Sequence, residues 1–92
     1  MPETVIFESE QQMDRADIAT SLRQVADSLA AGEPITLSAG DQSTTVAPTA
    51  RPEFEVKVER EGPADGAGEL SVEFEIEWPE DGTEDDGGLT ID

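Results

Sequence analysis

Residues 69–78 read ELSVEFEIEW, and this stretch decides the fold. Alternation with a period of two is typical of a strand that turns one face to an apolar environment and the other to water. Pro79 follows directly and has no backbone N–H to donate, so the strand is predicted to end before it. The apolar positions are Leu70, Val72, Phe74, Ile76 and Trp78, and the residues between them are Glu or Ser.

Residues 53–60 (EFEVKVER) alternate in the same way, and a loop rich in Gly and Pro, residues 61–68 (EGPADGAG), separates the two runs. Two alternating runs joined by such a loop predict an antiparallel hairpin with one apolar face and one charged face. The charged face is expected to carry Glu53, Glu55, Lys57 and Glu59 on the first strand, and Glu69, Ser71, Glu73, Glu75 and Glu77 on the second.

One amphipathic helix is predicted before this hairpin, over Asp14–Ala31. Asp14 fits the N-cap position, and Asp17 stands three residues later as the acid of a capping box. Gly32 tolerates the left-handed backbone that closes a helix, and Pro34 prevents the helix from continuing. Apolar residues recur at helical spacing and form one stripe, which consists of Ile18, Leu22, Val25, Ala26 and Leu29.

Three shorter segments are predicted as strands. Residues 34–39 (PITLSA) and 42–47 (QSTTVA) flank Gly40-Asp41, a dipeptide that favours a two-residue hairpin turn. Residues 4–9 (TVIFES) are rich in β-forming side chains and predict a first strand.

Together these elements predict an α+β fold in which an antiparallel sheet of about four to five strands is packed on one face by a single amphipathic helix. This domain is expected to span residues 1–79. Residues 80–92 carry acidic residues and Gly without periodicity, so they are predicted to form an acidic, mobile C-terminal tail. Leu89 and Ile91 are the side chains of the tail that could dock on the domain.

The order and spacing of three stretches resemble the amphi-Trp domain. They are FESE at Phe7–Glu10, ADIATSLRQVADSLAAGEPITL at residues 16–37 and EFEIEW at residues 73–78. This family of short domains, named for an amphipathic strand and a terminal Trp, is common in haloarchaea and also occurs in bacteria. The resemblance covers about residues 4–78 and implies the fold and a halophilic origin. The family has no assigned activity, so the resemblance implies no catalytic residue.

The chain is strongly acidic, with 23 Asp and Glu against five Lys and Arg and a net charge of -18. In dilute buffer this charge opposes compaction, whereas at about 1 M salt the Debye length falls to about 3 Å and neighbouring carboxylates hardly interact. We interpret the surface as halophilic; an acidic protein of an ordinary cell is the alternative. No apolar stretch has the length of a membrane span, and no signal-like run opens the chain, so a cytoplasmic location is expected.

The residue types that catalysis and metal binding require are scarce. Cys and His are absent, which removes thiolates and the commonest general base and metal ligand. The carboxylates fall on polar strand positions or in loops, where water solvates them. Residues 81–92 place acids at some EF-hand positions, but Asp86 stands where that loop needs Gly. We therefore predict no enzymatic activity, no cofactor and no metal site. Gly62, Gly66 and Gly68 lead into a strand rather than a helix, so no phosphate cradle is predicted either.

Three side chains are candidates for contacts with a partner: Trp78, Arg15 and Arg23. Trp78 is interpreted first as a cover for the core, in phase with Ile76, and alternatively as an anchor for a partner. Arg15 and Arg23 lie eight residues apart on the predicted helix and could share its polar side. Ion pairs with neighbouring acids are their simpler use, and contact with an acidic partner is the alternative.

The leading hypothesis is a non-enzymatic protein-interaction or assembly module that binds itself or another protein; a homodimer through an open sheet edge is one form. A second hypothesis is a binder of a small ligand or a divalent cation, in a cleft between helix and sheet. A third is an acidic imitation of nucleic acid that occupies a basic protein. Direct binding to nucleic acid is not expected from a net charge of -18, and neither is binding to a membrane.

Overall fold

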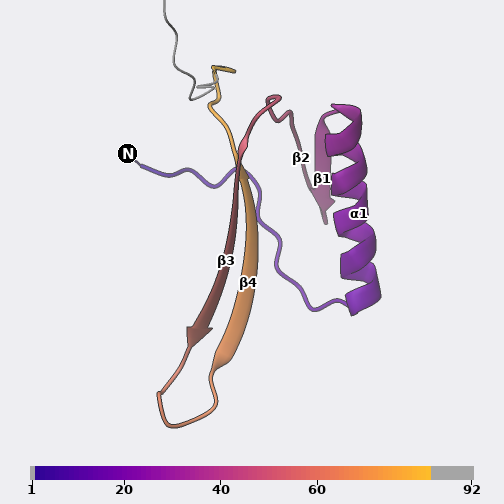
Figure 1. The fold of residues 1–92 in the computed structure, drawn as a ribbon. Coiled ribbons are helices and arrows are strands. Elements are labelled where there is room, and N and C mark those ends of the chain that lie inside the picture. Colours follow the sequence, from indigo (N-terminus) through magenta and orange to yellow (C-terminus); the bar gives the residue numbers. More distant parts are fainter. Residues whose placement is uncertain (1, 84–92) are drawn as a thin grey trace, which may run out of the picture. The chain divides into compact units, whose positions relative to one another are not determined.

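The computed structural model describes residues 2–83 of the chain. It divides into two compact units, residues 1–47 and 48–92, and each unit is described by itself. The α+β class predicted from the sequence is confirmed. The elements, in chain order, are α1 (Arg15–Ala31), β1 (Ile35–Ala39), β2 (Gln42–Val46), β3 (Glu53–Glu61) and β4 (Glu69–Glu77) (Figure 1).

The start of α1 confirms Asp14 as the N-cap residue, in an extended conformation with φ −63° and ψ 147°. The predicted capping box is wrong, because the Asp14 side chain makes no capping hydrogen bond. Instead, the backbone carbonyl of Asp14 accepts hydrogen bonds from the N–H groups of Asp17 and Ile18, both at 3.0 Å. A capping box uses Glu or Gln at the third helical position, and the side chain of Asp17 is one methylene shorter.

The end of α1 confirms Gly32 as the closing residue. Its backbone is left-handed, with φ 69° and ψ 27°. The N–H groups of Gly32 and Glu33 donate to the carbonyls of Leu29 and Ser28, at 3.2 and 2.9 Å, which satisfies two of the carbonyls that a helix end leaves without a partner.

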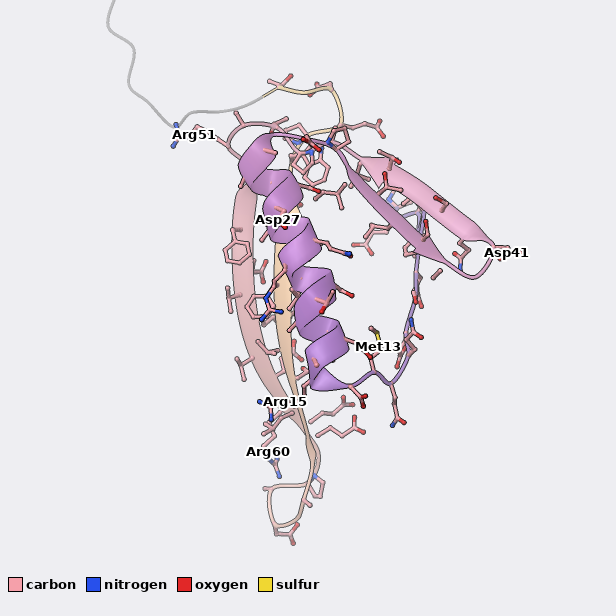
Figure 2. The ribbon with its side chains drawn as sticks, turned by 90° about the vertical axis from the view of Figure 1, so that its right-hand side faces the viewer. Met13, Arg15, Asp27, Asp41, Arg51 and Arg60 are labelled. Atoms are coloured by element: carbon pink, nitrogen blue, oxygen red, sulfur yellow. The ribbon has the colours of Figure 1, made fainter. Side chains whose placement is uncertain are left out.

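In the first unit, β1 and β2 form an antiparallel hairpin, and β1 is the strand that contacts α1 (Figure 1). Figure 2 shows Asp41 at the tip of this hairpin. Only Gly40 of the two turn residues has a positive φ, 61°, which fits a type II′ turn with Gly at its first central position. Ile35, with 8% of its surface exposed, is the only buried apolar residue between residues 2 and 83.

In the second unit, β3 and β4 pair antiparallel over nine residues each, and the pairs keep the two faces that the alternation predicts. The rings of Phe54 and Phe74 stack diagonally across the hairpin, with centroids 6.4 Å apart and planes at 11°. The directly paired apolar residues are Phe54 with Ile76, Val56 with Phe74 and Val58 with Val72. The directly paired residues of the opposite face are Glu53 with Glu77, Glu55 with Glu75, Lys57 with Glu73, Glu59 with Ser71 and Glu61 with Glu69.

Two sequence-based expectations differ from the structure. The four strands of the described residues form two separate two-stranded sheets, not one sheet packed on one face by α1. The predicted first strand over residues 4–9 is wrong, because this segment is irregular. Its side chains favour the extended conformation, but a strand also needs the backbone of a partner, and no described strand pairs with it.

Candidate protein-interaction surface

The apolar face of the β3–β4 hairpin is the most distinctive surface of the described chain. It lies opposite a charged face on the same two strands because side chains alternate across a strand. A nine-residue strand is about 30 Å long, so the face is long and narrow. More than half of each side chain's surface is exposed: Phe54 61%, Val56 54%, Val58 71%, Leu70 78%, Val72 56% and Phe74 57%.

The charged face carries eight glutamates and one lysine. Three of its direct cross-strand pairs are Glu opposite Glu, and like charges placed opposite each other cost about 0.2–1 kcal/mol per pair in ordinary solvent. Lys57 offsets part of this repulsion, since its Nζ lies 2.7 Å from Oε1 of Glu59. The hydrogen bond to Glu59 and the charges of Glu59, Glu73 and Glu55 raise the pKa of Lys57 above its ordinary value of 10.5.

The apolar face ends at Arg60, which is opposite Leu70 in the register. The guanidinium turns into the loop that joins the strands and donates to the carbonyls of Pro63 and Gly66, at 2.8 and 2.6 Å, and more weakly to that of Gly62 at 3.5 Å. The charge of Arg60 is thus used within the loop, and Figure 2 shows it at that end of the hairpin. No role for Arg60 was predicted from the sequence.

Close backbone contact explains two of the loop glycines. Gly62 has φ 142°, and a Cβ atom added to it would lie 2.6 Å from the Cα of Gly68. A Cβ added to Gly68 would collide with the carbonyl of Glu61. The two strands therefore leave the ladder so close together that neither position accepts a side chain.

The residues predicted to contact a partner belong to different units: Trp78 to the second, and Arg15 and Arg23 to the first. Trp78 is half-buried and lies one residue beyond β4. The ladder ends with Glu53 opposite Glu77, and Pro52, which would stand opposite Trp78, has no backbone N–H to donate. Arg15 and Arg23 are both exposed on α1. No carboxylate among residues 2–83 lies within 4.0 Å of either guanidinium, so the expected ion pairs are not formed there.

Sequence analysis placed a possible cleft between the helix and the sheet, and the first unit contains a groove between α1 and β1. Its volume is about 360 Å³, and it is lined by Ser21, Gln24, Val25 and Ser28 of α1 and by Ile35, Thr36, Leu37 and Ser38 of β1. The periodicity of the sequence could not locate this groove, because it depends on how the hairpin diverges from the helix.

Residues 2–83 contain no evident metal centre: no group of three or more acidic, His or Cys side chains in this range is placed to hold a metal ion. No helix in that range is long and apolar enough to cross a bilayer. Asp81 accepts a hydrogen bond from the N–H of Thr83 at 2.9 Å, which lowers the pKa of its carboxyl group below the usual 3.8. The rest of the predicted acidic tail, with Leu89 and Ile91, lies outside the described residues.

The described residues 2–83 define a class of small α+β protein, in which one helix is followed by a short hydroxyl-rich hairpin and by a long hairpin with one apolar and one acidic face. The sequence matches the Amphi-Trp domain over residues 1–92. The chain therefore belongs to the Amphi-Trp domain family, and the match extends beyond the range of about residues 4–78 over which the resemblance was recognised. No curated protein and no solved structure matches the chain.

Proposed function

We propose that this protein is a non-enzymatic interaction or assembly module of a salt-rich cytoplasm, and that the apolar face of the β3–β4 hairpin is its binding surface. The observation that carries the proposal is the exposure of this face. Six large apolar side chains from two adjacent strands are each more than half exposed, and such continuous apolar patches mark protein contacts in soluble proteins.

The division of charge supports the same proposal. No carboxylate lies on the apolar face, and its one cation, Arg60, is bound to loop carbonyls. A partner can therefore cover this face without removing a carboxylate from water, which would cost several kcal/mol per ion. At about 1 M salt or more, apolar contacts persist while charge attraction is screened. The apolar face therefore suits binding in the concentrated salt solution that the acidic composition indicates.

The test compares two double variants of the hairpin. Val58→Thr with Val72→Thr changes one direct pair on the apolar face, and Glu55→Gln with Glu75→Gln changes one direct pair on the charged face. Thr keeps the β-branched shape of Val but adds a hydroxyl. The tagged wild type and both variants are used to recover partners, including untagged copies of the chain, at about 2 M KCl, where charge contacts are screened.

A partner at fixed stoichiometry that wild type and the Gln variant retain, and that the Thr variant loses, supports the proposal. Recovery of no partner, or equal recovery by all three proteins, contradicts it. A Thr variant that melts at lower temperature with unchanged binding also contradicts it, because the apolar face would then serve only the stability of the chain. Release of a basic partner as KCl rises would favour acidic imitation of nucleic acid instead.

A further inference from the structure

The groove between α1 and β1 follows the edge of a strand. Four consecutive residues of β1, from Ile35 to Ser38, line it. Because neighbouring side chains point to opposite faces of a sheet, a groove bordered by four consecutive residues is the pattern expected along a strand's edge. Ser21, Gln24, Val25 and Ser28 of α1 form the other wall. In Figure 2, β1 is the strand of the hairpin nearer to α1.

The register indicates which backbone groups face this edge. The two-residue turn pairs Ala39 with Gln42 as a hydrogen-bonded pair, and such pairs alternate along an antiparallel hairpin. Thr36 and Ser38 therefore stand in non-hydrogen-bonded pairs and direct their N–H and C=O groups away from β2. Their hydroxyl groups agree with this assignment, since they approach those of Thr45 and Ser43 to 3.0 and 3.2 Å, as expected of the closer pairs.

This edge lacks the protection that exposed edges normally have. Natural proteins protect open edges with charged side chains or Pro, and β3 and β4 carry Glu or Lys at almost every second residue. Neither β1 nor the groove's helical wall contains a charged residue, in a chain with a net charge of -18. No other strand within residues 2–83 pairs with β1. The edge is thus open to an uncharged strand.

One segment of the described chain has the complementary properties. Residues 4–7 (TVIF) are uncharged and consist of β-forming residues, yet they are irregular. Val5 and Ile6 are 70% and 76% exposed. Glu8 directly follows this segment and lies on the β2 side of the hairpin of the same chain. Its carbonyl accepts a hydrogen bond from Nε2 of Gln42, the first residue of β2, at 3.4 Å. We infer that residues 4–7 of a second copy add as a strand to the β1 edge.

Reciprocal strand addition gives each first unit a three-stranded sheet backed by a helix. A two-stranded hairpin alone is marginal in water, whereas three strands packed on a helix are stable. Extended backbone presents Val5 and Phe7 on one side and Thr4 and Ile6 on the other, so one apolar pair can face the apolar groove residues Val25, Ile35 and Leu37. Exchange of the same segment in both directions makes a closed two-fold dimer. This contact does not use the β3–β4 face, so it goes beyond the proposed function.

Matched proline variants test the edge. Ser38 and Ser43 face each other and share one hydroxyl contact, and each directs its N–H away from the hairpin. Ser38→Pro therefore removes an N–H donor from the β1 edge, and Ser43→Pro removes one from the outer edge of β2. Both substitutions lose the same hydroxyl contact inside the hairpin. By sedimentation equilibrium at about 2 M KCl, with charge repulsion screened, we expect wild type and Ser43→Pro to be dimers and Ser38→Pro to be a monomer.

A second variant tests the segment without touching the edge. Val5→Glu with Ile6→Glu places charge on the added strand and should weaken dimerisation at least about tenfold, while Glu3→Gln should leave it unchanged. A cross-linking experiment tests whether the added strand comes from a second copy. Chains that carry only Ile6→Cys are mixed with chains that carry only Thr36→Cys, and a short thiol cross-linker is added. The natural chain contains no Cys. A covalent dimer with one chain of each kind is expected.

Three results would overturn the inference. A monomeric wild type would exclude the dimer. A single chain carrying both cysteines that cross-links within itself at any dilution would show that the chain's own segment fills the groove. A dimer that survives Ser38→Pro but dissociates in the Val58→Thr and Val72→Thr double variant would be formed by the β3–β4 face, which contradicts strand addition and supports the proposed function.

Discussion

The two hairpins of this protein differ in how their apolar side chains and their strand edges are protected. The β1–β2 hairpin has five-residue strands without charge, a two-residue turn and a contact with α1. The β3–β4 hairpin has nine-residue strands, a seven-residue connection and Glu or Lys at almost every other position. One protects its apolar side chains by packing and leaves its edge open, while the other protects its edges by charge and leaves its apolar face exposed. Alternation of sequence therefore indicates a strand but not what covers it.

The largest expected effect on the free energy of unfolding is the difference between truncating a buried side chain and truncating an exposed one of similar size. Ile35 is 8% exposed on β1 and Leu70 is 78% exposed on β4. Ile35→Ala should lower the free energy of unfolding by about 3 kcal/mol, as for other buried aliphatic residues, and Leu70→Ala by less than about 1 kcal/mol. Urea titrations measure both losses, followed by far-UV circular dichroism for the unit of Ile35 and by tryptophan emission for the unit of Leu70. Similar losses would mean that the β3–β4 face is covered in solution.

Removal of salt should act mainly on the β3–β4 hairpin. Its three direct Glu–Glu pairs, Glu53 with Glu77, Glu55 with Glu75 and Glu61 with Glu69, are screened at high salt. At about 0.6 kcal/mol each, they cost about 2 kcal/mol without screening, which is about 10 °C for a domain of this size. Melting temperature at about 2 M and about 0.05 M KCl measures the total, because the Debye length differs severalfold. Amide exchange should show the loss in β3 and β4 before β1 and β2; equal loss in both would contradict this assignment.

Gly68→Ala should be the most damaging change in the loop between β3 and β4. The added Cβ would collide with the backbone of Glu61, which cannot move without breaking the last pair of the ladder. We expect a loss of about 1.5 kcal/mol. Gly66→Ala is the matched control, because its Cβ would meet only Cγ of Pro63, at 3.3 Å. Chemical unfolding compares the two, and a Gly66 variant as unstable as the Gly68 variant would mean that the close backbone approach is not the cause.

Arg60→Gln should loosen the same loop with a smaller loss, about 1 kcal/mol, because the hydrogen bonds of the guanidinium to Pro63 and Gly66 are exposed to water. Arg60→Lys should be nearly as harmful, since a single ammonium group cannot bond both carbonyls with the geometry of a guanidinium. Amide exchange and limited proteolysis at residues 62–68 report the effect. Restoration of wild-type protection by Lys would show that charge alone is sufficient.

The smallest effect concerns Lys57 and depends on pH. Its pKa is raised in the folded state by Glu59, Glu73 and Glu55, so its contribution to stability is complete below the unfolded value of 10.5 and is lost as pH rises through the folded value. Lys57→Gln should therefore lower the melting temperature slightly near pH 8 and make no difference well above pH 10.5, in dilute buffer. The difference should shrink with added KCl because the group is exposed. A difference that grows at high pH would contradict this sign.

Local sequence patterns predicted most of the secondary structure. Gly32 and Pro34 located the end of α1, and the alternation around Phe54 and Phe74 predicted the two faces of the β3–β4 hairpin. These features depend on backbone preferences and on a period of two, which neighbouring residues encode. The tight turn at Gly40 was encoded in the same way.

Features that depend on distant partners could not be predicted. Residues 4–9 have the composition of a strand, but strand formation needs another segment's free edge, which no local pattern reveals. The single sheet was inferred because one amphipathic helix and one apolar sheet face complement each other, yet the strands form two sheets. The groove beside β1 depends likewise on how distant segments pack. The loop contacts of Arg60 are local by comparison, and the sequence signal for them was an Arg at a strand end followed by Gly and Pro, whose carbonyls lack strand partners.

The place of Trp78 just beyond β4 makes the two units optically distinct. The chain contains one Trp and no Tyr, so near-ultraviolet absorption above the Phe bands and all tryptophan emission come from that one half-buried indole. The only helical signal within residues 2–83 comes from α1, in the other unit. Emission wavelength and the helical component of far-ultraviolet ellipticity therefore follow different halves of the same unlabelled molecule. A titration with denaturant, salt or a partner can be followed in both halves at once, and the separation of the two curves measures how strongly the halves are coupled.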